Sequence, residues 1–296
     1  MTEPSATLAV IGGSGFYQMH GLKDVRSVTV DTPYGGPSDS IVLGRYEGTE
    51  MAFLPRHGAG HHIAPSEIPQ QANIWALASL GVRQIISVSA VGSLKEDIAP
   101  LDMVLPDQLI DRTSLRDPSF FGRGIVAHIS FDEPLCPSMR AAIGAAASAS
   151  GLRTHEGGAL VVIEGPAFST RAESEVYRSW GASVIGMTAL PEARLAREAG
   201  ICYATLACVT DYDTWHESEE KVSVELIVAN LQKNVAAARG IVAAVASNPP
   251  GRDACDCAFA LRDAIITRLD AVPDERKAEL GPVLDRYYES RKRLQE

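Results

Sequence analysis

The stretch Tyr203-Ala204-Thr205-Leu206-Ala207-Cys208-Val209-Thr210-Asp211-Tyr212-Asp213 decides the fold that we expect for this chain. It begins as a very apolar run of β-type residues and ends in two acids that are separated by one residue. A helical pattern at 192–199 precedes it, and another follows at about 222–245. An apolar run of this length between helical patterns is typical of a buried strand in an α/β sheet.

The same alternation of short strands and helices recurs along the rest of the chain, so we expect one continuous sheet with helices on its faces. A long irregular stretch is expected at 100–133, after which Pro137 occupies a favourable first-turn position of a helix. The other expected strands cover 7–11, 41–45, 51–54, 84–89, 159–163 and 183–185, and the other expected helices cover 70–80, 137–151 and 172–180.

The segment Asn248-Pro249-Pro250-Gly251-Arg252-Asp253 is the clearest hinge in the sequence. We therefore divide the chain into a main domain at 1–247 and a helical extension at 248–296 that packs on the same domain. Two amphipathic helices are expected in this extension, at about 255–270 and 274–293.

Composition and charge exclude several classes of function. The 296 residues carry a formal net charge of -10, which repels a phosphodiester backbone, so no nucleic-acid partner is expected. The first residues, Met1-Thr2-Glu3-Pro4, lack a basic start, and no long apolar run follows them before Gly12. We therefore expect neither a signal peptide nor a membrane span, and we expect a cytoplasmic protein.

The five cysteines do not resemble the disulfide framework of a small secreted domain. Cys136, Cys202 and Cys208 lie in apolar runs and are expected to be core thiols, whereas Cys255 and Cys257 follow the hinge in a segment that we expect to be exposed. The tail pair offers too few ligands for a metal site. His57, His61 and His62 crowd one loop without a cysteine or acidic ligand, so no metal is expected there either.

Three loops that follow predicted strands carry groups suited to an anion. Ser14 lies in Gly12-Gly13-Ser14-Gly15, the pair Arg56-His57 follows another strand, and Ser89-Ala90 follows a third. Amides, hydroxyls, a guanidinium and an imidazole at strand ends can bind phosphate together, although each loop alone could be an ordinary strand exit. No acidic cluster suited to Mg²⁺ accompanies them, so free phosphate is expected as a co-substrate, with no cofactor.

Asp211 and Asp213 would form the other half of the site. Two carboxylates at i and i+2 after a buried strand can accept hydrogen bonds from the N–H groups of a heterocycle, although they could also be solvated turn acids. A carboxylate matched to an exocyclic amine favours adenine over hypoxanthine, whose carbonyl oxygen would face a negative charge.

The order of motifs resembles the methylthioadenosine phosphorylase branch of the trimeric purine nucleoside phosphorylases, over nearly the whole chain to about residue 240. The resemblance implies a single-domain α/β fold of the nucleoside phosphorylase type, with a central mixed twisted sheet and a C-terminal helical extension. The motifs are Gly12-Gly13-Ser14-Gly15-Phe16, Thr32-Pro33-Tyr34-Gly35, Arg56-His57-Gly58, Gln71-Ala72-Asn73-Ile74-Trp75-Ala76-Leu77, Asp111-Arg112-Thr113, Glu164-Gly165-Pro166, Met187-Thr188, Pro191-Glu192 and Thr210-Asp211-Tyr212-Asp213-Thr214-Trp215.

The resemblance also implies roles for single residues, with Arg56, His57 and Asp211 as the catalytic set. Phosphate would be bound by Ser14, Arg56, His57, Ser89, Ala90 and Thr188. Met187 would lie beneath the ribose, Phe168 against the purine face, and Asp211 with Asp213 at N7 and the 6-amino group. The alkylthio end would lie among Val224, Ile227 and His128 of a neighbouring chain in a homotrimer, with a dimer of trimers as the alternative assembly.

The sequence departs from this family pattern at several positions. Ala167 stands where the family usually has Arg, and Gly186 stands where many members have Asn, which affects fine specificity rather than reaction type. Ser14 and Ser89 keep the hydroxyl of the usual threonines. The tail pair resembles members with a Cys-x-Cys motif, some of which form a disulfide there, and its redox state stays open.

Three competing functions remain at this point. One is a phosphorylase of inosine, guanosine or methylthioinosine, whose pockets prefer an amide-bearing residue where this chain has acids. Another is a phosphorylase of adenosine or 5'-deoxyadenosine, and the third is a non-catalytic nucleoside-binding protein.

Overall fold

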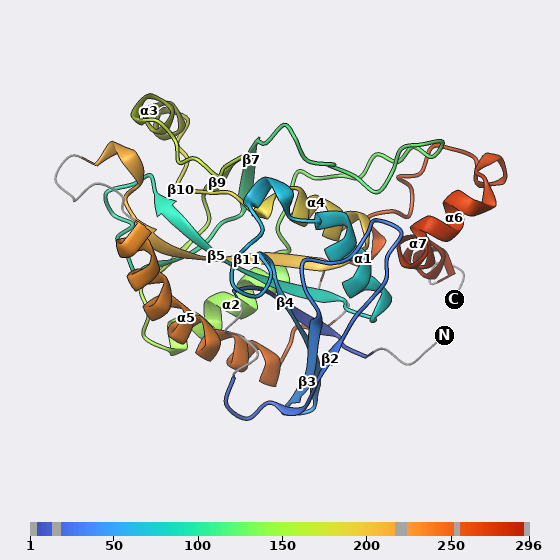
Figure 1. Cartoon of the computed structure of the whole chain (residues 1–296), viewed down its shortest axis with the longest axis horizontal. Coiled ribbons are helices and arrows are strands. Elements are labelled where there is room, and N and C mark those ends of the chain that lie inside the picture. The colour runs from blue at the N-terminus through green and yellow to red at the C-terminus, as the bar shows by residue number, and fades with distance from the viewer. Residues whose placement is uncertain (1–4, 14–18, 217–223, 252–254, 293–296) are drawn as a thin grey trace.

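The computed structural model describes residues 5–13, 19–216, 224–251 and 255–292, with the side chains of 224–227 excepted. It confirms the predicted single-domain α/β fold (Figure 1). In the described residues, eleven strands join one mixed sheet, in the order β2-β3-β4-β1-β5-β10-β9-β7, and β11, β6 and β8 branch from β5. The strands are β1 (Leu8–Gly12), β2 (Lys23–Val28), β3 (Ile41–Tyr46), β4 (Thr49–Pro55), β5 (Gln84–Ser93), β6 (Met103–Leu105), β7 (Gln108–Arg112), β8 (Thr154–Glu156), β9 (Ala159–Ile163), β10 (Val184–Gly186) and β11 (Cys202–Asp211).

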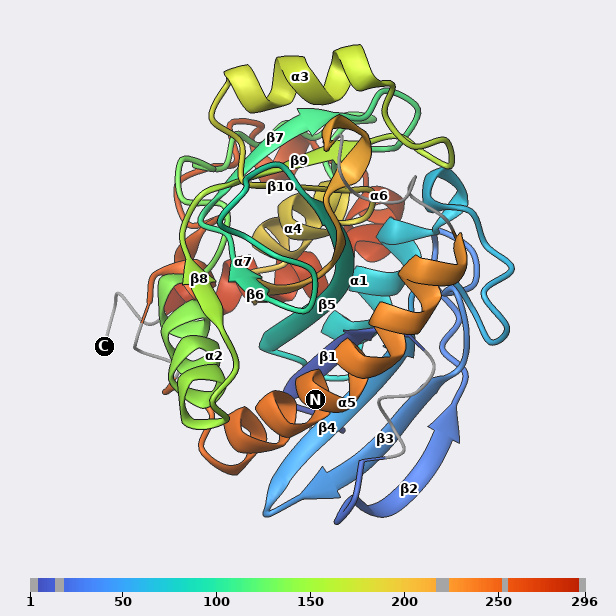
Figure 2. The ribbon, with the colours of Figure 1, turned by 90° about the vertical axis from the view of Figure 1, so that its left-hand side faces the viewer.

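Strand β5 is the centre of the sheet (Figure 2). It pairs in parallel with β1 only as far as Ser87, and with β11 along nearly its whole length, up to Gly92 opposite Asp211. Beyond β1, the far end of β5 turns to an antiparallel pairing with β10 at Gly92 and Ser93. The sheet therefore opens next to the second half of β5, where β1 has ended and β10 lies further along.

Helices cover both faces of this sheet (Figure 1). Helices α2 and α5 pack on one face with one apolar cluster, and α1 and α4 pack on the other with a second cluster that reaches the tail helix α7. The helices are α1 (Gln70–Ser79), α2 (Pro137–Ala149), α3 (Arg171–Ser179), α4 (Ala189–Glu198), α5 (Val224–Ser247), α6 (Asp274–Leu280) and α7 (Pro282–Lys292).

The expected helix at 255–270 is wrong. Two short 3-10 turns stand there instead, η4 (Cys257–Phe259) and η5 (Leu269–Ala271). Between them Ile265 forms a β-bridge with Ala127, flanked by hydrogen bonds from His128 N to Ala264 O and from Ile266 N to Val126 O. These distant backbone partners replace the helical hydrogen bonds, and the β-branched pair Ile265-Ile266 suits an extended backbone.

The second tail helix is interrupted rather than continuous. Gly281 has a φ of 41°, so α6 ends at Leu280, and Pro282 starts α7. The tail is anchored to the main body by Trp75 Nε1, which donates to the Glu279 carbonyl at 3.0 Å, and by Arg286 Nη2, which donates to the Val82 carbonyl at 3.2 Å. The boundary after residue 247 stays a prediction.

The stretch 100–133 is less irregular than expected, because β6 and β7 lie within it. β2 and β8 were also not predicted. These strands are short, with three to six residues each. Apart from β2, each of them pairs with strands that lie far away in the sequence. A local pattern of so few residues carries little information on pairing.

The expected exposure of both tail cysteines is wrong for Cys257, which is buried. The structure also supplies the nearby ligands that the sequence did not reveal, because Cys136, Cys202, Cys255 and Cys257 place their sulfur atoms within 4.8 Å of one another. None of the described helices is long and apolar enough to span a membrane.

Candidate active site

Arg56 directly follows β4 and is almost completely buried beside the end of β1. Its guanidinium forms a bidentate ion pair with Glu192 of α4, with Nε and Nη2 each 2.9 Å from a carboxylate oxygen. Nη2 also donates to Ser87 Oγ at 2.7 Å, and Nη1 donates to the Val88 carbonyl at 3.1 Å. The arginine therefore joins β4, β5 and α4 at one point.

The carboxylate of Glu192 is fully buried and accepts further hydrogen bonds. Tyr203 Oη donates to it at 2.8 Å and Ser87 Oγ at 3.0 Å. A buried charge pair is tolerated only when such bonds satisfy its remaining donors and acceptors. Burial and the charge of Glu192 raise the pKa of Tyr203 well above its ordinary value, so this phenol stays a donor.

The predicted phosphate residues gather around this pair. Ser89 Oγ on β5 lies 3.2 Å from Thr188 Oγ1, which precedes the first turn of α4, and Ala90 follows Ser89 on the same strand. The backbone N–H of Arg56 donates to the Gly12 carbonyl at the end of β1. Arg56 was predicted to bind phosphate, but its Nε and Nη2 atoms pair with Glu192 instead. Ser14 lies outside the described residues.

His57 is held in one tautomer. Its Nδ1 lies 2.8 Å from the carbonyl oxygen of Ile63, and because a carbonyl only accepts, Nδ1 carries the proton. Burial lowers the pKa of His57 to about 4, so the ring is neutral at neutral pH and Nε2 keeps a lone pair. His57, predicted to bind phosphate, therefore offers Nε2 as a hydrogen-bond acceptor, which suits the P–OH group of monohydrogen phosphate.

Asp211 and Asp213 are both buried at the end of β11. Asp211 accepts hydrogen bonds from Thr210 Oγ1 at 2.7 Å and from the backbone N–H of Asp213 at 2.8 Å. Oδ2 of Asp213 has no hydrogen-bond partner in the part of the chain that the structure describes. Burial raises the pKa of both carboxyls, and the pKa of Asp213 reaches about 6, with a further contribution from the charge of Asp211.

Gly92 makes room for these acids. A Cβ atom added there would lie 3.0 Å from Asp211 Oδ1 and 3.2 Å from Asp213 Cβ. Gly92 is also the residue at which β5 exchanges its pairing with β11 for that with β10. The close approach of the acids to β5 therefore depends on a missing side chain.

Other residues that position the acids were missed by the sequence analysis. Asn230 and Asn234 of α5 donate to the carbonyls of Thr210 and Val209, at 2.8 and 2.9 Å. Trp215 Nε1 donates to the Ser93 carbonyl at 2.8 Å. The apolar spacing of α5 gave no sign that its asparagines would reach the end of β11.

Arg116 was also missed by the sequence analysis. Its Nε pairs with Glu164 at 2.8 Å, and its Nη1 donates to the carbonyls of Met187 and Leu190 at 2.7 and 2.6 Å. Glu164 also accepts from the backbone N–H of Ser114 at 2.7 Å. This network fixes the backbone of Met187, which was predicted to lie beneath a ribose.

The other predicted substrate residues are placed less closely. Phe168 is 48% exposed, so its ring is open to a ligand. His128 is exposed on a segment that the tail holds, through the bond from its backbone N–H to Ala264. Val224 and Ile227 belong to α5, but their side chains are not described.

Strand β5 sets the distance between the two ends of the site. Val88 contacts Arg56, and Gly92 contacts Asp211. Four residues of strand span about 13 Å. This distance suits a nucleoside in line with an anion, with the base at the acids and the anion beside Ser89 and Thr188.

The fold and the two ends of this site define a member of the Phosphorylase superfamily, whose family profile matches residues 7–247. The chain is 53% identical to the S-methyl-5'-thioadenosine phosphorylase of Geobacter sulfurreducens, over 95% of this chain and 98% of that one. The corresponding enzyme of Synechocystis is 51% identical, over 97% and 89%.

Solved structures agree. A methylthioadenosine phosphorylase from an antarctic soil metagenomic library superimposes with a TM-score of 0.89 at 49% identity, over 95% of this chain and 99% of that one. The Schistosoma mansoni methylthioadenosine phosphorylase in complex with adenine gives 0.78 at 37% identity, over 82% and 91%. The chain belongs to the S-methyl-5'-thioadenosine phosphorylase family, as its motifs predicted.

We expect Glu192→Gln to lower the free energy of unfolding by about 3–5 kcal/mol, because it leaves Arg56 buried without a counter-charge. Urea unfolding followed by circular dichroism measures this. Glu175→Gln is the matched control, since Glu175 pairs with Arg178 on the exposed side of α3, where the loss should stay below about 1 kcal/mol. Equal stability of Glu192→Gln and wild type would show that the pair does not hold these elements together.

We expect Asp213→Asn to change how stability depends on pH. The carboxyl titrates near 6 when folded and near its ordinary 3.8 when unfolded, so wild type loses stability as pH rises through this window. The variant should lack that loss and gain about 3 kcal/mol over wild type between pH 4 and pH 7.5. Unfolding in urea across that range measures the difference.

Asp24→Asn is the control for this experiment. Asp24 has a φ of 54°, close to the 51° of Asp213, but it is exposed. Asn accepts the left-handed backbone region as readily as Asp, so neither variant adds backbone strain. If the two variants showed the same pH profile, the burial of Asp213 would not be its cause.

Proposed function

We propose that this protein is a pentosyltransferase that cleaves S-methyl-5'-thioadenosine with inorganic phosphate to adenine and 5-methylthioribose 1-phosphate. The observation that carries the proposal is the separation of about 13 Å along β5 between the hydroxyl and arginine end and the two buried acids. Phosphate serves as co-substrate, and no cofactor takes part.

Phosphate attacks the sugar at C1' and stabilises the positive charge that develops there. Cleavage passes through a ribosyl cation as the base leaves, and phosphate held beneath C1' lowers the energy of that cation. Ser89 and Thr188 donate hydroxyl hydrogens, and the remaining N–H of Arg56 Nη1 adds a positive contact. The neutral His57 accepts the P–OH hydrogen at Nε2, which turns the unprotonated oxygens toward the sugar.

The acids neutralise the leaving purine. A departing adenine carries negative charge that a proton at N7 removes, and a carboxyl must hold a proton near neutral pH to supply it. Burial raises the pKa of Asp211 above its ordinary value, which favours a proton on this carboxyl. In our assignment Asp211 serves N7, while Asp213, whose buried Oδ2 lacks a protein partner, accepts from the 6-amino group.

We also propose that the 5'-alkylthio group lies among Val224, Ile227 and His128 of a neighbouring chain. The exposed position of His128 on a loop held by the tail supports a role between subunits. We further propose that the protein is a homotrimer, or a dimer of trimers, and that it works in the cytoplasm in purine and methionine salvage. Phe168 would cover the purine, and Met187 the ribose.

The reaction is tested by offering the purified protein methylthioadenosine, 5'-deoxyadenosine, adenosine and inosine, each with and without phosphate. We expect base release that depends on phosphate and is greatest with methylthioadenosine, because the acids match a 6-amino group and an apolar pocket matches the thioether. Chromatography of the free base measures it. Release at the same rate without phosphate, or a preference for inosine, would contradict the proposal.

We expect Asp211→Asn to lower kcat on methylthioadenosine by about 100-fold or more, because an amide cannot donate an acidic proton at N7. Steady-state kinetics with saturating phosphate measures this, and Asp285→Asn on the exposed face of α7 is the control. A kcat near that of wild type would remove Asp211 from the mechanism.

A further inference from the structure

Four cysteines from three distant parts of the chain meet at one point. Cys136 precedes α2, Cys202 begins β11, and the tail brings Cys255 and Cys257 to them. Their sulfur atoms all lie within 4.8 Å of one another. Cys255 Sγ lies 3.3 Å from that of Cys202 and 3.5 Å from that of Cys136. All four are free thiols.

These distances match the edges of a metal tetrahedron. Zinc binds thiolate sulfur at about 2.3 Å, which places the four sulfurs of a tetrahedral site about 3.8 Å apart. A disulfide requires about 2.05 Å, and two thiols at i and i+2, such as Cys255 and Cys257, bridge only with strain. The cluster therefore has the ligand number, ligand type and spacing of a tetrathiolate site.

The surroundings also suit a closed site. Cys136, Cys202 and Cys257 are buried, and all four cysteines belong to or pack against the apolar cluster between the sheet and α2 with α5. Cys255 is partly exposed and leaves a path for an ion to enter. Ser138 adds a polar contact, with Oγ 3.2 Å from Cys136 Sγ. Helix α2 starts directly after Cys136, so its positive end faces the sulfurs.

We propose that Cys136, Cys202, Cys255 and Cys257 form a structural site for a soft, tetrahedral divalent cation of the zinc class. Binding forms four metal–sulfur bonds and releases the thiol protons to solvent, which leaves a cluster of net charge -2. Four protein ligands fill the tetrahedron, so the ion has no open position for a substrate.

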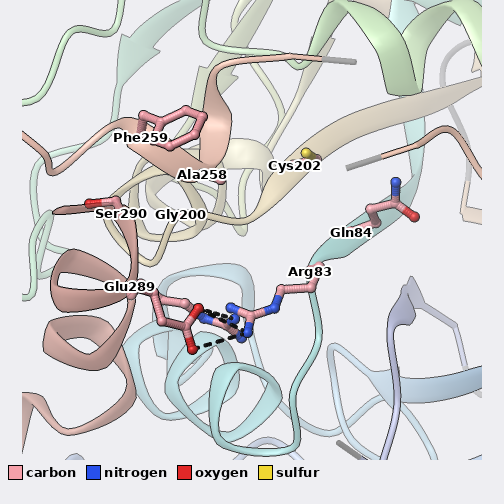
Figure 3. Close-up of a pocket in the computed structure, with 9 residues that line it drawn as sticks. Arg83, Gln84, Gly200, Cys202, Ala258, Phe259, Glu289 and Ser290 are labelled. Carbon is pink, nitrogen blue, oxygen red and sulfur yellow. Dashed lines mark hydrogen bonds and ion pairs between the residues drawn. The ribbon is translucent and has the colours of Figure 1, made fainter. Parts of the chain in front are cut away.

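The site is remote from the nucleoside site. Cys202 and Asp211 are the first and last residues of β11, and nine residues of strand separate them by about 30 Å. Figure 3 shows Cys202 at this end of β11, near Gly200 and near Ala258 and Phe259 of the tail. The ion would tie the tail to β11 and α2, and its function is to fasten the extension.

The first test is metal binding by the whole, fully reduced protein, purified without added metal and then titrated with Co²⁺ and Zn²⁺. We expect about one ion per chain, and a cobalt spectrum with the intense visible bands and sulfur charge transfer of a tetrahedral tetrathiolate. Zinc should displace cobalt, and a chelator should lower the unfolding temperature of the zinc-loaded protein.

Cys255→Ser is the test variant, because this partly exposed thiol can be replaced with little change to the core. It should bind cobalt at least about 100-fold more weakly and lose the tetrathiolate spectrum. Cys208→Ser is the matched control, since Cys208 is a buried thiol on the same strand outside the cluster, and it should bind like wild type. Circular dichroism confirms that both variants are folded.

Two results would overturn the site. One is the absence of a tetrathiolate spectrum in protein whose thiols are all reduced, or equal binding by Cys255→Ser and wild type. The other is mass spectrometry of protein isolated anaerobically that finds these cysteines already joined as disulfides. Because the readouts are binding, spectrum and stability, they stand apart from the assay of phosphorolysis.

Discussion

The buried ion pair between Arg56 and Glu192 is the interaction on which the rest of the site depends. It joins the end of β4 to α4, and its further bonds reach Ser87 on β5 and Tyr203 on β11. Removing both charges from water is costly, and the cost is offset only because nearly every donor and acceptor of the pair is used. The elements that carry ligand groups are thus held at fixed distances before any ligand arrives.

This ion pair also determines which groups remain to bind phosphate in the site that we propose. Because Glu192 neutralises Arg56, the phosphate binding that we propose depends on hydroxyls, on backbone amides and on one remaining guanidinium N–H. At the other end, burial raises the pKa of Asp211 and of Asp213 above the values of exposed carboxyls. Strand β5 connects these two environments, and the absence of a side chain at Gly92 lets the acids approach it. The ion pair and the two buried acids therefore lie along one strand.

The tail shows a different use of distant contacts. Its extended segment forms a β-bridge with Ala127 beside His128, its helices contact Trp75 and Val82, and its cysteines meet Cys136 and Cys202. The same extension thus supports a loop that we predict to contact a neighbouring subunit, and it supplies two of the four cysteines of the proposed metal site.

The sequence by itself determined the α/β class, the long strand that ends in Asp211 and Asp213, and the family, because these depend on local apolar patterns and on motifs in a fixed order. Ser89, Arg56 and the acids could be predicted because strand ends are recognisable in a sequence, whereas Thr188 was predicted from the family motif alone. Only the tertiary structure decided that the fork of Arg56 binds Glu192, that His57 accepts rather than donates, that Ile265 forms a bridge instead of a helix, and that four cysteines converge. Each of these depends on partners six to well over a hundred residues away, and on burial, which no local pattern records.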